Sequence, residues 1–155
     1  MPRAGAASCE HVFDAPASAY MTSQGSPYAR FKRALATGNP LLIRSTAAEL
    51  PRVELADALA VCLALAAADD DAYGRAAARF AARWSLELPG VSLEETQALG
   101  TALQALRARE TSAMGHRLLD ALVQARGLER MQSALAAYTA RLADAYPEDS
   151  GDSRP

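Results

Sequence analysis

The chain has 155 residues, half of them hydrophobic, which fits one domain with a single core. Its formal net charge of -2 argues against a general nucleic-acid binder but allows a local basic patch. About a quarter of the residues are alanine, and the β-branched and aromatic residues that strands prefer are sparse, so composition excludes a β-rich fold and predicts an all-α one.

Residues 1–26 are rich in alanine, serine, glycine and proline and show no hydrophobic periodicity, which predicts a disordered N-terminal tail. The tail lacks the apolar region of a signal peptide, and no stretch is apolar over the roughly 20 residues that a membrane span needs. We therefore expect a cytoplasmic protein without a membrane segment. Met21 offers a second start codon, so translation begins at either Met1 or Met21.

Two signals of a capping residue followed by proline open the folded part. Ser26 and Pro27 predict the start of a first helix, which Gly38 is expected to end. Asn39 and Pro40 then predict the start of a second, short helix. The two helices are expected to form a first antiparallel pair.

The central segment, residues 54–68, reads ELADALAVCLALAAA. Its only charges, Glu54 and Asp57, fall in the first turn, where acidic side chains favour the positive end of the helix dipole. Beyond Asp57 the segment is apolar on every side, so other helices must surround it. We therefore predict that it is the buried central helix.

Three aspartates, Asp69, Asp70 and Asp71, follow and are predicted to cap the next helix, so that residues 54–88 form a helical hairpin. This next helix is expected to have two faces. The core face recurs at helical spacing and comprises Tyr73, Ala77, Phe80 and Trp84. The other face, which we call the arginine line, recurs every four residues and comprises Arg75, Arg79 and Arg83.

A further helix is predicted after the turn signal Pro89-Gly90, because Ser92 followed by Glu95 is a capping box. Its inward side is expected to comprise Leu93, Leu99, Leu103 and Leu106. It should fade at the polar residues 109–112.

Residues 112–146 are predicted to form either one helix or two. An apolar, heptad-like seam crosses Gly127 and comprises Met114, Leu118, Ala121, Ala125, Leu128, Met131, Leu135, Tyr138, Leu142 and Ala145. We favour two helices, because Gly127 stands between the charged Arg126 and the apolar Leu128, as a C-capping glycine does. The polar residues 147–155 predict a disordered C-terminal tail.

The elements add up to about seven helices in one domain, residues 27–146. Short connections predict antiparallel pairs, arranged as a compact bundle or as a short helical array. The sequence has no fixed repeat period, so a solenoid is not predicted.

Sequence motifs for catalysis or cofactor binding are missing: there is no glycine-rich phosphate loop, paired-cysteine zinc site, HExxH or Gly-x-Ser-x-Gly. His116 is the only histidine of the predicted domain, and we expect it at the surface or between helices rather than as a general base. The metal-capable residues of the tail lack a known ligand spacing; they are Cys9, Glu10, His11 and Asp14. We predict no enzyme, no cofactor and no metal site.

The arginine line has two interpretations. It is either an anion-facing strip for phosphates or an acidic partner helix, or a solvated face that balances nearby carboxylates, and we prefer the second. Our leading functional hypothesis is a non-enzymatic module that presents this line, or the C-terminal seam, to another protein or to a second copy. The alternative is a nucleic-acid-associated regulator that combines the line with Arg30 and Arg33.

Residues 31–106 resemble a family of small all-helical proteins of actinobacteria to which no activity is assigned. The matching segments are RALATGNP at 33–40, ELPRV at 49–53, DAL at 57–59 and YGRAAARF at 73–80, followed by Trp84 and the capped helix. The resemblance implies an all-α fold and a cytoplasmic location, and it brings no catalytic residues.

Overall fold

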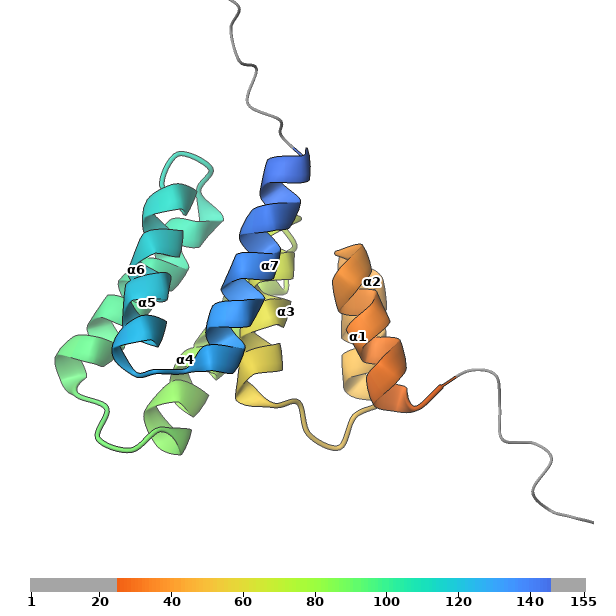
Figure 1. Ribbon diagram of the computed structural model, residues 1–155, viewed down its shortest axis with the longest axis horizontal. Helices are drawn as coiled ribbons and strands as arrows, with labels where there is room; N and C mark the ends of the chain where they lie inside the picture. The colour runs from red at the N-terminus through yellow and green to blue at the C-terminus, as the bar shows by residue number, and fades with distance from the viewer. Residues whose placement is uncertain (1–24, 146–155) are drawn as a thin grey trace, which may run out of the picture.

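The computed structural model describes residues 25–145; most of the predicted N-terminal tail and all of the C-terminal one lie outside this range. Within it the chain forms seven helices and no strand, which confirms the all-α prediction (Figure 1). The helices are α1 (Pro27–Thr37), α2 (Pro40–Ala48), α3 (Leu55–Ala67), α4 (Tyr73–Glu87), α5 (Leu93–Arg107), α6 (Ser112–Ala125) and α7 (Glu129–Ala145).

Helix α3 lies at the centre of the bundle, as its apolar sequence predicts. It contacts α1, α2, α4, α5 and α7. Leu59 and Leu63 have no exposed surface, and Leu65 is 1% exposed. A helix that is apolar on every side is most stable when other helices shield all of it from water. Five helices pack against α3.

The last helix, α7, covers one side of α3, and Figure 1 shows the two running in the same direction. At their N-terminal ends an ion pair joins Arg130 Nη1 to Glu54 Oε2 at 2.7 Å. Helix α6 packs against α5, and α7 packs against α3. In Figure 1, α6 and α7 form a layer in front of α5 and α3. The bundle is therefore closed by a contact between distant parts of the chain.

Helices α1 and α2 form a hairpin on another side of α3, around a small separate core. This core comprises Phe31, Ala34, Leu35, Ile43 and Ala64. Asp57, which we expected to interact with the helix dipole alone, is 6% exposed and holds the hairpin to α3. Its Oδ1 accepts a hydrogen bond from Lys32 Nζ at 2.9 Å, and its Oδ2 accepts one from Tyr28 Oη at 3.0 Å.

Most of the predicted helix ends are confirmed. The side chains of Ser26 and Asn39 accept hydrogen bonds from backbone N–H groups in the first turns of α1 and α2. Gly38 ends α1 in the left-handed conformation, with φ of 69°. Gly127, with φ of 63°, follows α6, so residues 112–145 form two helices rather than one.

The predicted cap at the start of α4 is wrong in detail. The helix begins at Tyr73, and Ala72 is its N-cap without a side-chain hydrogen bond. Asp70 Oδ1 instead accepts from the N–H of Ala72 at 2.8 Å, and Asp69 has φ of 48°. The aspartates therefore build a tight turn before the helix, because aspartate tolerates a left-handed backbone and bonds to its own main chain.

Four residues predicted on the inward side of α5 or in the seam are exposed: Leu93, Met114, Ala121 and Ala125. Leu93, at 70%, and Met114, at 46%, lie in the first turns of their helices. Periodicity assigns a residue to a face, but it does not reveal whether a neighbouring helix extends as far as that turn.

Candidate binding groove

The arginine line lies on α4, but its three members differ. Arg83 is engaged: its Nε donates to Glu87 Oε1 at 2.6 Å, and Glu87 also pairs with Arg52 at 3.2 Å. Arg75 and Arg79 are exposed and form no ion pair with any residue in the range 25–145. The line thus offers two unpaired cations rather than three.

The aromatic face of α4 belongs to the core, as predicted. Tyr73 is 4% exposed, Phe80 1% and Trp84 0%. The hydroxyl of Tyr73 donates to the backbone carbonyl of Leu103 on α5. These rings are therefore not available to stack on a nucleic-acid base beside the arginines.

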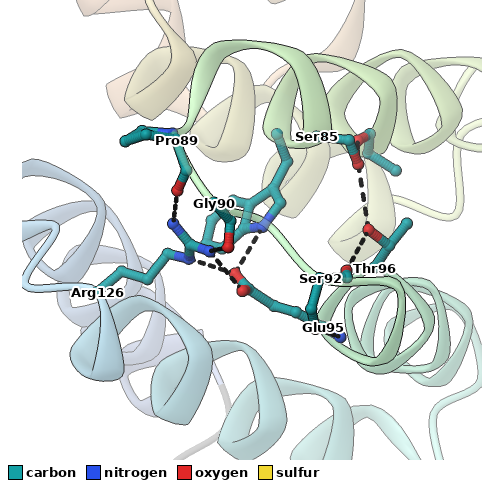
Figure 2. Close-up of polar contacts among 9 residues, drawn as sticks. Ser85, Pro89, Gly90, Ser92, Glu95, Thr96 and Arg126 are labelled. Carbon is teal, nitrogen blue, oxygen red and sulfur yellow. Dashed lines mark hydrogen bonds and ion pairs between the residues drawn. The ribbon is translucent and has the colours of Figure 1, made fainter.

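A polar network ties Trp84 to α5 and to the end of α6 (Figure 2). Trp84 Nε1 donates to Glu95 Oε1 at 3.0 Å, and Arg126 Nη2 donates to Glu95 Oε2 at 2.6 Å. Arg126 Nη1 also donates to the carbonyl of Pro89 at 2.8 Å. The network satisfies the indole N–H of a buried tryptophan and fixes the α4–α5 turn, so its role is structural.

Hydrogen bonding to Arg126 lowers the pKa of Glu95 below its ordinary value. A carboxylate with a lowered folded-state pKa adds stability above its ordinary pKa, and this stability is lost as pH falls through the lowered value. We expect Glu95→Gln to lower the melting temperature at pH 7, and the difference from the wild type to shrink as pH falls below about 4. Thermal melts followed by circular dichroism across this range test it.

The matched control is Glu110→Gln, which removes an exposed carboxylate from the α5–α6 loop. Its melting temperature should stay close to that of the wild type at every pH. A constant difference between Glu95→Gln and the wild type from pH 7 into acid would contradict the prediction.

A groove of about 1440 Å³ lies between α6 and α7. The C-terminal ends of α3 and α5 complete it. Its apolar lining contains three leucines, Leu106, Leu135 and Leu142, and six alanines from α3, α6 and α7. The small alanines leave room that larger side chains would fill.

Arginines line the groove where α5 ends and α6 begins: Arg107, Arg109 and Arg117. Arg107 and Arg117 are exposed, and neither forms an ion pair with a residue that the structure describes. Of the two lining aspartates, Asp120 lies farther along α6 and accepts a hydrogen bond from Gln124 Nε2 at 2.7 Å. The groove therefore combines a mostly apolar lining, interrupted by the polar side chains of Ser112, Gln132 and Thr139, with a cluster of arginines at one end.

His116 and Tyr138 meet across this groove, one from α6 and one from α7. Their rings stack with centroids 4.8 Å apart and an angle of 6° between planes. Burial lowers the pKa of His116, so the imidazole is neutral at pH 7. Its Nε2 is shielded from solvent and has no hydrogen-bond partner among residues 25–145, which agrees with the expected interhelical position.

Local sequence patterns do not predict this groove as a site. Arg107, Arg109 and Arg117 surround the predicted break between two helices, and that clustering was the available signal. These arginines line one groove only because α7 packs against α3, and local sequence patterns do not reveal this packing.

No protein-family model, curated protein or solved structure matches this chain. The resemblance to the actinobacterial family therefore stays a prediction. Among residues 25–145, no group of three or more histidine, cysteine, aspartate or glutamate side chains is placed to hold a metal ion. None of the helices in this range is long and apolar enough to cross a membrane.

Proposed function

We propose that the protein is a non-enzymatic helical module that binds another protein through the groove between α6 and α7. The observation that carries this proposal is the combination of a mostly apolar groove with two exposed arginines at one end, Arg107 and Arg117, that form no ion pair with a described residue. Its volume of about 1440 Å³ exceeds the roughly 300–1,000 Å³ of common small-molecule pockets, so a protein segment suits it better.

The groups nearest to catalytic chemistry support a non-enzymatic role. Burial raises the pKa of the Cys62 thiol in α3 to about 12, so it is protonated and a poor nucleophile at pH 7. His116 has its Nε2 closed off from solvent. A general base must come within hydrogen-bond reach of the proton that it takes, and this nitrogen offers no such access.

The groove is a better candidate than the two surfaces suggested by the sequence. The part of the C-terminal seam on α7 is buried in the fold, since Met131, Leu135 and Tyr138 are at most 4% exposed, and its exposed members on α6 are Met114 and two small alanines, Ala121 and Ala125. The arginine line retains two unpaired cations but lies beside no concave apolar surface among the cavities described. Exposed cations alone contribute little binding free energy, whereas apolar burial in a groove contributes about 25 cal/mol for each Å².

Two charge-reversal variants separate these surfaces. Arg107→Glu/Arg117→Glu changes the groove, and Arg75→Glu/Arg79→Glu, the matched control, changes the arginine line. All four positions are exposed, so both variants should keep the helical content and melting temperature of the wild type.

The tagged protein and both variants are then used to capture partners from cells that produce it, with and without nuclease. We expect a protein partner that survives nuclease, is lost with the groove variant and is retained with the arginine-line variant. Loss only with the arginine-line variant would overturn the proposal, and loss on nuclease treatment would favour the nucleic-acid alternative. Light scattering at increasing concentration tests whether the partner is a second copy of the chain.

A further inference from the structure

The shape of the groove specifies the kind of segment that fits it. Its walls are α6 and α7, with α3 and α5 behind them, so an occupant lies along helices on both sides. An amphipathic helix in such a groove buries one apolar face and leaves the other in water. The lining residues of α7 run from Gln132 to Ala143, which sets the length of the occupant at about three turns.

The alanines of the groove specify the apolar face of the occupant. Ala113 of α6 and Ala136, Ala140 and Ala143 of α7 line the walls. Small residues let another helix approach closely but supply little contact area themselves. The occupant must therefore bring the large side chains, such as leucine or phenylalanine at positions i, i+4 and i+7.

The charged residues of the groove specify the direction in which the bound helix lies. At the end where α5 stops and α6 starts, three arginines line the groove, against a single aspartate, Asp69. Helix termini at this end carry only about half a charge each, and their effect fades within one turn, so the whole charges of the arginines dominate. One turn beyond Arg117 the next charged lining residue of α6 is Asp120, and the lining residues of α7 carry no charge.

We infer that the groove binds an amphipathic helix of a partner protein whose acidic end lies beside Arg107 and Arg117. This inference rests on the proposed function and adds the chemistry and the direction of the occupant. Carboxylates at the arginine end form charge-assisted hydrogen bonds with guanidinium groups, and lysines there would be repelled.

The probe is a displayed library of peptides as long as α6, 14 residues, with leucine along one helical face and equal glutamate, lysine, glutamine and serine elsewhere. The full chain selects binders. Ala140→Trp, which fills the groove at an exposed alanine, removes sequences that bind elsewhere. Ala137→Trp is the matched control, because Ala137 is exposed on the same helix but does not line the groove.

Among groove-dependent peptides we expect glutamate to exceed lysine by about tenfold at one end only. The variant Arg107→Glu/Arg117→Glu should reverse this preference, and Arg75→Glu/Arg79→Glu should leave it unchanged. Equal glutamate and lysine at both ends would overturn the inference while leaving the groove as a protein-binding site. Recovery of no peptide that distinguishes the wild type from Ala140→Trp would overturn the proposed function itself.

Discussion

Replacing Trp84 with alanine is expected to lower the free energy of unfolding by about 4 kcal/mol. The side chain has no exposed surface and packs against Phe80, with ring centroids 6.0 Å apart. Alanine removes most of the buried apolar area and leaves a cavity among α4 and its neighbours. It also removes the indole N–H that donates to Glu95 at 3.0 Å. Urea unfolding followed by circular dichroism measures the loss.

The variant Trp84→Phe separates the contribution of apolar packing from that of the indole hydrogen bond. Phenylalanine fills much of the volume but cannot donate to Glu95, which still accepts two hydrogen bonds from Arg126. Because the carboxylate keeps these charged donors, the loss should be clearly smaller than for alanine, at about 1 to 2 kcal/mol. Equal losses for the two variants would show that packing at Trp84 contributes little, contrary to this expectation.

Replacing Gly115 with alanine is expected to destabilise the protein by about 2 kcal/mol, although alanine is the better helix former. A Cβ atom at this position would lie 2.7 Å from the carbonyl oxygen of Ala102 and 2.8 Å from the backbone nitrogen of Leu106. Both atoms belong to the backbone of α5, so relief requires the two helices to separate. The strain of about 3 kcal/mol outweighs the propensity gain of about 1 kcal/mol.

Gly100→Ala is the matched control for this prediction. Gly100 also lies inside a helix, α5, and a Cβ atom there would have no neighbour within 4 Å. We expect this change to raise the free energy of unfolding by up to about 1 kcal/mol through helix propensity. If the two substitutions shifted the urea midpoint in the same direction, the close approach of α5 and α6 at Gly115 would not control stability.

The sequence predicted features that depend on neighbouring residues. Caps and terminal glycines act within one turn, so Ser26, Gly38 and Gly127 could be assigned from local patterns. The central place of α3 could be predicted because a helix without a polar side has only one stable environment. The fold class followed from composition, because alanine is abundant and the residues that strands prefer are sparse.

The remaining features depend on contacts between distant residues. The sequence predicted only a helix-dipole interaction for Asp57, because its hydrogen bonds to Lys32 and Tyr28 come from another helix. Helix propensity alone would favour alanine at Gly115, and only the close approach of α5 explains why a side chain is excluded there. The groove likewise requires α7 to lie beside α3, a pairing of helices from opposite ends of the described chain.

This pairing of α3 with α7 has a consequence during protein synthesis. The most apolar helix leaves the ribosome early, but the helix that covers one of its sides is the last of the seven to appear. Until then α3 presents leucines that the finished fold hides completely, and exposed apolar surface of this kind promotes aggregation of nascent chains. Completion of the bundle therefore awaits the synthesis of α7.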